Sequence, residues 1–249
     1  MSAVSLQLIR TIKELQSLSS LSNFALAGGT NLALRYNHRK SIDIDLFCND
    51  IIGIEGFETI AKEMKAYYNN NVFSIDYPCK ENDQFVFLRC FINKPNGAIK
   101  IELLQNMKTL FPNEIINDIR FISRKDIGLF KLESAANRAG KKDIYDLDFI
   151  TDDISIVDLF NYLKIKKQKF NTPTDKTIFD MDEVVCPTIN PKLLLKFDGG
   201  INKKNTLPIH TDDNIDIKSG SKTWIASRTS WRMKVRKLFR HLDIVYPSS

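Results

Sequence analysis

The feature that most constrains the fold is the segment Ser41–Phe47, in which polar and apolar residues alternate. Successive side chains of a β-strand point to opposite faces, so this pattern predicts a half-buried strand. The residues expected to face the core are Ile42, Ile44 and Leu46. Asp43 and Asp45 then share the other face, where carboxylates about 7 Å apart repel each other unless a cation neutralises them.

A pair of carboxylates on one strand face is a suitable site for a hard divalent cation. Mg²⁺ is usually bound through one or two carboxylates together with the phosphates of a substrate, and Mn²⁺ is the expected substitute. The sequence therefore predicts a metal site at Asp43 and Asp45. For the pair taken alone, a solvated acidic face on an edge strand is the simpler explanation, so the neighbouring motifs decide between the two.

The first neighbouring motif is Gly28-Gly29-Thr30, which precedes a short helical pattern ending at Tyr36. Paired glycines let the backbone approach a ligand closely, and the first turn of a helix presents unpaired N–H groups to an anion. Thr30 adds a hydroxyl group. The combination suits a triphosphate, whereas the three residues by themselves are also typical of an ordinary turn.

A second alternating segment, residues 99–103, places Lys100 and Glu102 on its polar face. Glu102 is a candidate for a third acid, which would complete a two-metal site and take a proton from an attacking hydroxyl. A salt-bridged, exposed strand explains the same spacing equally well.

A long helical pattern follows over Asp126–Ile150. At 100° per residue, Arg138 and Lys142 each lie about 20° from Lys131 on the helical wheel, and Asp146 lies about 60° away. Such a face suits the phosphates of a nucleotide, with Asp146 orienting Lys131 or Lys142. The alternative is a ladder of ion pairs four residues apart. A glycine two residues after Arg138 is a point where the helix could be interrupted.

The pattern of elements changes near residue 120. Helical and strand-like segments alternate before this point, and almost all later segments are helical. We therefore expect an α+β domain, a mixed sheet with flanking helices, over residues 1–120, and a mainly α-helical domain over residues 121–249. The expected helices are 3–20, 30–36, 56–68, 126–150, 154–167, 191–197 and 224–242. The expected strands are 41–47, 72–76, 84–92 and 99–104, with a turn at 95–97.

The net charge of +6 is concentrated at the C-terminal end, because Ile217–Ser249 holds eight Lys and Arg residues and one acid. Such a basic block is typical of proteins that bind a polyanion. An apolar stripe is expected to dock the last helix: Trp231, Val235, Leu238 and Leu242. Four arginines at a spacing of four are the candidate RNA-binding residues: Arg228, Arg232, Arg236 and Arg240. A solvated helix face is the alternative, and the pattern assigns no role to residues 168–222.

No segment reaches the roughly 20 consecutive apolar residues needed to span a bilayer. The N-terminal residues lack the basic and apolar regions of a secretory signal. We therefore expect a cytoplasmic protein with no membrane partner. The four cysteines are dispersed, without the paired spacing of a zinc site.

Taken in order, these motifs resemble those of the AbiEii/AbiGii toxin family. The runs Leu26–Arg35 and His38–Phe47 resemble its first signature, and Asp126–Leu147 resembles its second. Members of this family are nucleotidyltransferases of the DNA polymerase beta superfamily. They act as toxins in toxin–antitoxin pairs or in abortive-infection defence against phages. The resemblance covers residues 20–150.

The resemblance implies a minimal nucleotidyltransferase fold whose C-terminal domain completes the site and binds the acceptor. The implied reaction moves a nucleoside monophosphate from an NTP substrate to RNA, with the 3′ end of tRNA as the expected acceptor. The catalytic residues would be Asp43, Asp45, Glu102, Lys131 and Asp146, with the metal at Asp43, Asp45 and Glu102. The nucleotide-binding residues would be Gly28, Gly29, Thr30, Arg39, Ser41, Lys131, Arg138 and Lys142.

Two other functions are compatible with the same residues. The acceptor of the nucleotide could be a protein side chain instead of RNA. The chain could also be a non-catalytic module that binds a nucleotide or a cognate antitoxin, which is the expected protein partner of a toxin of this kind.

Overall fold

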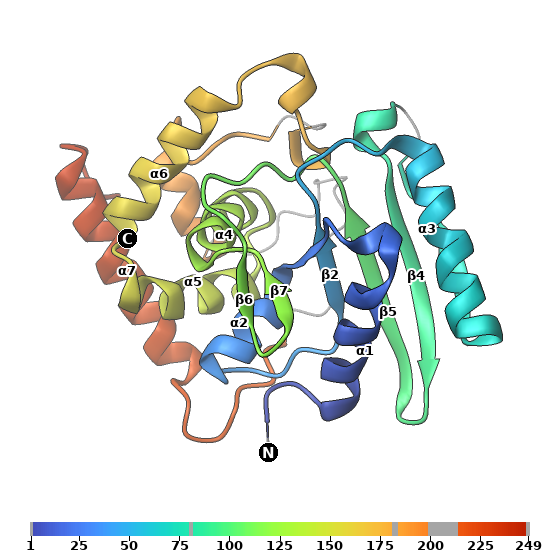
Figure 1. Ribbon diagram of the computed structural model, residues 1–249. Helices are drawn as coiled ribbons and strands as arrows, with labels where there is room; N and C mark the ends of the chain where they lie inside the picture. Colours follow the sequence, from blue (N-terminus) through green and yellow to red (C-terminus); the bar gives the residue numbers. More distant parts are fainter. Residues whose placement is uncertain (1, 80–81, 181–183, 199–213, 248–249) are drawn as a thin grey trace. The chain divides into compact units, whose positions relative to one another are not determined.

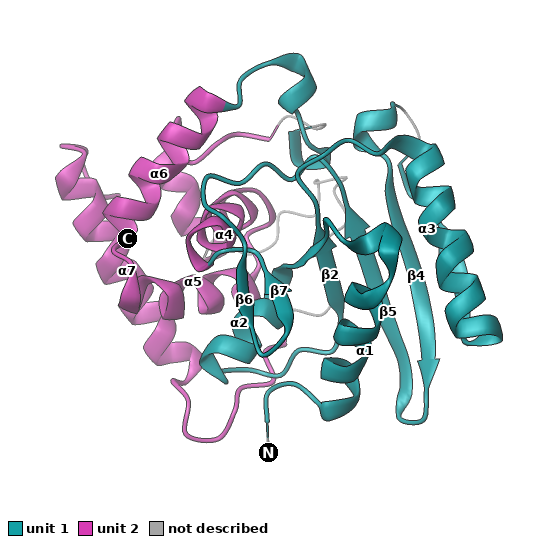
Figure 2. Cartoon of the chain, in the orientation of Figure 1, with its two compact units in different colours: residues 1–123, 170–181 teal, residues 124–169, 182–249 magenta. Residues whose placement is uncertain are grey.

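The computed structural model describes residues 2–79, 82–180, 184–198 and 214–247 (Figure 1). The chain forms two compact units, coloured separately in Figure 2. Unit 1 comprises Met1–Ser123 and Phe170–Met181, and unit 2 comprises Arg124–Lys169 and Asp182–Ser249. The sequence pattern places the boundary at residue 120 and does not anticipate that the chain returns to unit 1 after residue 169.

Unit 1 is built on a seven-stranded mixed sheet with the strand order β3-β4-β5-β2-β1-β7-β6. Strand β2 runs parallel to β5, and β1 runs parallel to β7, while the other neighbouring strands are antiparallel. The strands are β1 (Ala25–Leu26), β2 (Ile44–Phe47), β3 (Val72–Asp76), β4 (Phe87–Lys94), β5 (Gly97–Leu104), β6 (Glu114–Ile116) and β7 (Ile119–Phe121).

The core of unit 1 lies between the sheet and two amphipathic helices, α1 (Leu6–Ser17) and α3 (Gly53–Tyr68), both visible in Figure 1. Ile12 of α1, Ile60 of α3 and Ile101 of β5 are buried in the same apolar cluster. Because side chains alternate along β2 and β5, the polar residues between the core positions project from the opposite face of the sheet. That face carries the predicted site.

Helix α2 (Gly28–Tyr36) follows β1 directly and is fixed to unit 1 by a buried amide. The side-chain nitrogen of Asn31 donates hydrogen bonds to the carbonyl oxygens of Leu26, at 2.8 Å, and Ile122, at 3.0 Å. Arg35 donates from Nε to the Asn31 side-chain oxygen at 2.8 Å and forms an ion pair with Glu114. These bonds fix the N-terminus of α2, where the two glycines lie.

Unit 2 contains four α-helices among its described residues: α4 (Arg124–Arg138), α5 (Lys141–Asp153), α6 (Ile156–Lys169) and α7 (Trp224–His241). The prediction of one continuous helix over 126–150 is wrong. Ala139 has a left-handed φ of 54° and Gly140 is extended, so the chain leaves α4 and re-enters as α5. Lys131 and Asp146 therefore belong to different helices, and the helical-wheel relation between them does not apply.

Helix α7 is capped at its N-terminus by Thr223, whose hydroxyl accepts a hydrogen bond from the N–H of Ala226. Trp231, Val235 and Leu238 are fully buried, which confirms the docking function of the apolar stripe. The indole N–H of Trp231 also donates to a main-chain carbonyl, that of Leu194, at 3.0 Å. Leu242 is wrongly included in the predicted stripe, because the helix ends at His241 and Phe239 is buried instead.

A cluster of ion pairs joins α7 to α5. The Lys234 ammonium lies 2.7 Å from Asp148 and 2.6 Å from Asp152. Lys222, just before α7, contacts the same two carboxylates. Burial raises the pKa of Asp148, but hydrogen bonds from Lys234, Ser230 and Lys222 lower it by more, and the net pKa lies below its ordinary value. Lys222 and Lys234, two of the basic residues near the C-terminus, therefore stabilise the packing of α7 against α5.

The predicted strand 72–76 is confirmed, as is the turn at 95–97, which joins β4 to β5. The β6–β7 hairpin is not predicted, although its turn residues Asn117 and Asp118, both left-handed, are typical of such turns. In the region left without a role, 168–222, the residues 181–183 and 199–213 lie outside the described part of the chain. Among the described helices none combines the length and apolarity needed to cross a membrane.

Candidate active site

Two of the predicted catalytic residues lie on and just before β2, on the polar face of the sheet. Asp45 is within the strand and pairs in register with Glu102 of the parallel strand β5. Asp43 immediately precedes the strand, with 42% of its side chain exposed. The prediction that Ile42 faces the core is wrong, because β2 begins only at Ile44 and the Ile42 residue is 74% exposed.

The glycine pair at the start of α2 makes room for side chains of the site itself. A Cβ atom built on Gly28 would lie 1.8 Å from the Oδ2 atom of Asp45, and one built on Gly29 would lie 2.3 Å from the Nη2 atom of Arg39. Gly28 also has a φ of +61°, in the left-handed region that favours glycine. The glycines thus let the Asp45 carboxylate and the Arg39 guanidinium reach the first turn of α2.

Thr30 and Ser41 fix the backbone beside the acidic pair. The Thr30 hydroxyl is buried, donates to the main-chain carbonyl of Asp43 and lies 2.8 Å from the Ser41 hydroxyl. The structure therefore gives Thr30 a role in holding Asp43. Contact of Thr30, Ser41 or the glycines with a nucleotide stays a prediction.

Glu102 contacts two cations, which sequence reasoning did not assign to the site. Arg89 of β4 donates from Nε, at 2.8 Å, and approaches from Nη2, at 2.7 Å, both to the Oε1 atom of Glu102. The Lys100 ammonium lies 3.2 Å from the Oε2 atom of Glu102 and 3.6 Å from the Oδ2 atom of Asp43. These ion pairs match the alternative explanation of residues 99–103, a salt-bridged strand. We refer to these charged residues as the strand cluster: Arg89, Lys100, Glu102, Asp43 and Asp45.

The charges of the strand cluster shift the pKa values of its partly buried members. Burial lowers the pKa of Lys100, but the carboxylates of Glu102, Asp43 and Asp45 raise it by more, and its pKa lies above the ordinary value. Burial raises the pKa of Glu102, but Lys100 and Arg89 lower it by more, so its pKa lies below the ordinary value. Both groups are charged at neutral pH, which makes Glu102 a weak candidate for a proton acceptor.

The acidic pair has the donor chemistry that Mg²⁺ or Mn²⁺ requires. Asp43 and Asp45 supply carboxylate oxygens on one face of the sheet, and a substrate's phosphates can supply the remaining ligands. The described residues include no group of three or more acidic, histidine or cysteine side chains placed to hold a metal ion together. The residues present therefore fit a metal bound by two carboxylates and shared with a nucleotide.

A second cluster of predicted site residues lies in unit 2, between α4 and α5. The Lys131 ammonium lies 2.7 Å from Asp143 and 2.8 Å from Asp146, whose side chain is fully buried. Arg138 lies 3.7 Å from the other oxygen of Asp143. These four residues, called the helix cluster below, contain two cations and two acids. The pairing of Lys131 with Asp146 is the one that sequence reasoning anticipated, whereas the role of Asp143 was missed.

Asp143 is missed because a single helix would place it away from Lys131, and only the break after Arg138 brings the two together. Burial raises the pKa of Asp143, but Lys131 and Arg138 lower it by more, so the net pKa lies below the ordinary value. Lys142 lies in the first turn of α5 and is half-buried. Its predicted contact with a nucleotide stays a prediction.

The four arginines of α7 differ in exposure because a spacing of four residues winds about 40° per step around a helix. Arg228 and Arg232 are half-buried, whereas Arg236 and Arg240 are exposed. The Arg236 guanidinium lies 4.7 Å from the centre of the Tyr246 ring. The exposed part of the predicted RNA-binding stripe is therefore its C-terminal half.

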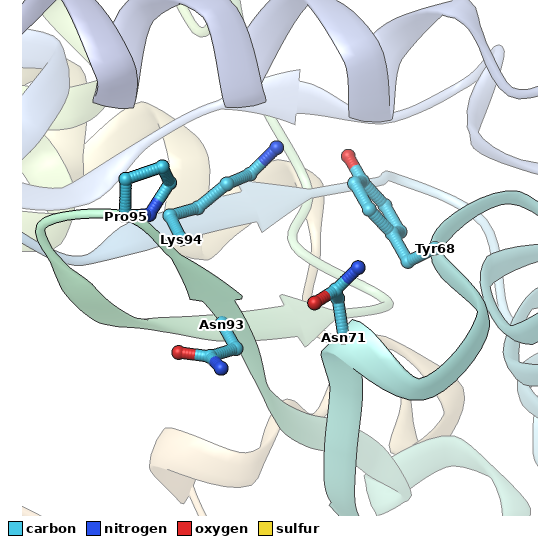
Figure 3. A pocket seen from close by; sticks show the side chains of 5 residues that line it. All are labelled: Tyr68, Asn71, Asn93, Lys94 and Pro95. Carbon is cyan, nitrogen blue, oxygen red and sulfur yellow. The ribbon is translucent and has the colours of Figure 1, made fainter.

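A hollow of about 430 Å³ lies beside the β4–β5 hairpin (Figure 3). It is lined by Tyr68, Asn71, Asn93, Lys94 and Pro95. The Lys94 ammonium is 2.7 Å from Glu14, which also accepts a hydrogen bond from the Tyr68 hydroxyl. None of the predicted site residues lines this hollow, and its one cationic group is already paired.

Comparison with known proteins assigns the chain to a family. Residues 15–197 match the family described as nucleotidyl transferase AbiEii toxin of type IV toxin–antitoxin systems. This match covers well over half of the chain and includes both the acidic pair and the helix cluster. The protein therefore belongs to the AbiEii family of nucleotidyltransferase toxins, as the resemblance of the sequence motifs indicated.

Two further comparisons give a relative of unstated function and a similar fold. An uncharacterized protein of Aquifex aeolicus is 31% identical over 141 residues, which are 56% of this chain and 63% of the relative, so the match spans under two thirds of that protein. The solved structure of MenT4, a nucleotidyltransferase toxin of Mycobacterium tuberculosis, has a similar fold, with a TM-score of 0.55 at 14% identity. That likeness covers 95% of this chain and 84% of MenT4, and it confirms the predicted α+β nucleotidyltransferase fold followed by helices.

Replacement of Gly28 by alanine should displace Asp45. The substitution adds backbone strain of about 1–2 kcal/mol at a positive φ and also places a methyl group where the Asp45 carboxylate lies. Gly220→Ala is the control, because Gly220 has a φ of +83°, nearer to that of Gly28, and no described atom lies within 4 Å of its Cβ position. Thermal unfolding should show a larger loss of stability for Gly28→Ala. Equal losses would mean that Asp45 does not depend on Gly28.

Replacement of Lys131 by methionine should leave two buried carboxylates short of a partner, at a cost of about 3–5 kcal/mol. In the wild type the lowered pKa of Asp143 contributes stability at all pH values above about 4, and this contribution disappears on further acidification. In the variant, burial without Lys131 raises that pKa, so stability is regained as the pH falls from 7 towards 4.

Melting temperatures at pH 7 and pH 4.5 test this reversal. The deficit of Lys131→Met relative to the wild type should shrink at the lower pH. Lys237→Met, which removes an exposed charge of α7, should show no comparable change. A deficit that stays constant over this range would contradict the arrangement of the helix cluster.

Proposed function

We propose that this protein transfers a nucleoside monophosphate from an NTP to the 3′ end of an RNA, with tRNA as the acceptor, and that it acts as the toxin of a toxin–antitoxin pair. The observation that carries the proposal is the acidic pair beside the glycine turn, in a chain of the AbiEii family. A hydroxyl and an NTP can react only where the charge of the triphosphate is offset, and carboxylates do this through a divalent cation.

In the proposed reaction, the hydroxyl oxygen of the acceptor forms a bond to the α-phosphorus. The bond from that phosphorus to the oxygen bridging to the β-phosphate breaks, pyrophosphate leaves and the hydroxyl proton is released. A bound Mg²⁺ or Mn²⁺ would neutralise the phosphates and favour the ionised form of the hydroxyl. Asp43 and Asp45 would hold it, while the N–H groups at the start of α2 would face the triphosphate.

The remaining predicted residues support the same reaction. Arg39 lies against Gly29 at the first turn of α2, where a guanidinium suits a phosphate. Lys131 is proposed to contact nucleotide phosphates, with Asp146 holding its ammonium in place. The exposed arginines of α7 provide cations for an RNA backbone. A protein antitoxin is the expected partner of a chain in this family.

Asp45→Asn should reduce nucleotide transfer by at least about a hundredfold, because it removes one of two carboxylates proposed to hold the metal. The assay mixes the full chain with α-labelled NTPs, Mg²⁺ and either total RNA or protein extract, and follows the label. Asp76→Asn is the control, because Asp76 is an exposed acid on β3. Its activity should match that of the wild type.

The same assay distinguishes the proposed acceptor from the others. Label on RNA that is absent with Asp45→Asn and retained with Asp76→Asn supports the proposal. Label found only on protein would show that the acceptor is a protein side chain and not RNA. Absence of label from both fractions under conditions where the protein binds NTP would favour a non-catalytic module.

Substitution of Arg236 and Arg240 together by glutamine should weaken RNA binding and reduce its dependence on salt. For each RNA phosphate that these arginines neutralise, the slope of log affinity against log salt concentration should fall by about 0.7 for a single strand. Arg10→Gln removes an exposed charge from α1 in unit 1 and serves as the control. Filter binding over a series of salt concentrations measures the slope, and an unchanged slope would remove α7 from the RNA-binding surface.

A further inference from the structure

The strand cluster contains more charge than the proposed reaction uses. Across the adjacent strands β4, β5 and β2, its charges alternate in a row: Arg89, Glu102, Lys100 and Asp43. Each neighbouring pair in this row is within 3.6 Å. Glu102 therefore lies between two cations, and Lys100 lies between two acids.

A metal ligand must offer an oxygen lone pair to the cation, and both oxygens of Glu102 already have partners. Its Oε1 atom accepts from Arg89, and its Oε2 atom faces the Lys100 ammonium. A metal on the remaining lone pair of Oε2 would lie directly beside the Lys100 ammonium, which holds the other. Like charges at this separation repel strongly in a partly buried site.

Asp43 is less restrained than Glu102. The Lys100 ammonium is farther from Asp43 than from Glu102, and 42% of the Asp43 side chain is exposed, against 16% for Glu102. Asp45 reaches the start of α2 over Gly28. The exposed Asp43 carboxylate can therefore meet a metal–nucleotide complex while Arg89 and Lys100 stay paired with Glu102.

We propose that Glu102 is a positioning residue that holds the Lys100 ammonium against Asp43, and that the metal is bound by Asp43 and Asp45 without Glu102. This inference rests on the proposed function, because it assigns roles within the same site. Before the metal arrives, Lys100 offsets part of the repulsion between the two aspartates.

The inference makes a prediction about metal binding that is separate from activity. Lys100 repels a divalent cation at Asp43, so Lys100→Met should bind Mn²⁺ more tightly than the wild type in the absence of nucleotide. The decisive variant is Lys100→Met combined with Glu102→Gln. It removes one positive and one negative charge, so the net charge of the protein is unchanged, and both replacements have nearly the size of the original side chain.

Titration of the full-length protein with Mn²⁺, followed by electron paramagnetic resonance of the free ion, measures the affinity. If Glu102 is a positioning residue, the double variant binds Mn²⁺ at least as tightly as the wild type. If Glu102 is a metal ligand, the double variant binds Mn²⁺ more weakly than the wild type, and the inference is overturned. Should that variant fail to show a wild-type melting transition, the polar pair Lys100→Gln with Glu102→Gln gives the same comparison.

Asp45→Asn separates failure of this inference from failure of the proposed function. Loss of Mn²⁺ binding in Asp45→Asn, with binding retained in the double variant, supports both. Loss of Mn²⁺ binding in both Asp45→Asn and the double variant would support the metal site but would show that Glu102 is one of its ligands. Retention of Mn²⁺ binding in Asp45→Asn, with Asp76→Asn as the control, would remove the acidic pair from the metal site and would overturn the proposed metal chemistry together with the inference.

Discussion

The crowding of carboxylates on one face of the central sheet is the constraint on which the site depends. Asp45 and Glu102 lie opposite each other on two parallel strands, and Asp43 immediately precedes one of these strands, so sheet formation brings the three charges together. Folding is compatible with this crowding because Arg89 and Lys100 lie among the acids. The metal is proposed to bind beside these cations, at Asp43 and Asp45.

In unit 2 a break between two helices, rather than the pairing of strands, brings the charged groups together. The left-handed residue Ala139 and the extended residue Gly140 end one helix and start the next, so that Lys131 meets Asp143 and Asp146. A continuous helix would have spread these groups along its length. Lys131 and Arg138 hold the pKa of the buried Asp143 carboxylate below its ordinary value. The Lys131 ammonium, itself mostly buried, is in turn held by two carboxylates, those of Asp143 and Asp146.

Much of the fold could be predicted because periodicity reports directly on burial: the strand at 72–76, the β4–β5 turn and the apolar stripe of α7 follow from it. The position of Asp45 was predictable for the same reason, since it lies between the buried residues Ile44 and Leu46 of β2, whereas Asp43 lies just before the strand. Contacts between elements were not predictable. Arg89 reaches Glu102 only through the register of β4 with β5, and Asp143 reaches Lys131 only through the break at Ala139. The left-handed conformation of an alanine is not signalled by its residue type.

Gly28 links the backbone of one element to the side chain of another, because its missing side chain is the space that Asp45 fills. Two separate constraints therefore restrict substitution of Gly28. The left-handed backbone disfavours any residue with a side chain at position 28. Such a residue would also clash with Asp45 unless Asp45 were replaced by a smaller residue or moved. Since a chain without Asp45 would no longer need the space, an alanine at position 28 would mark a descendant whose site had already been abandoned.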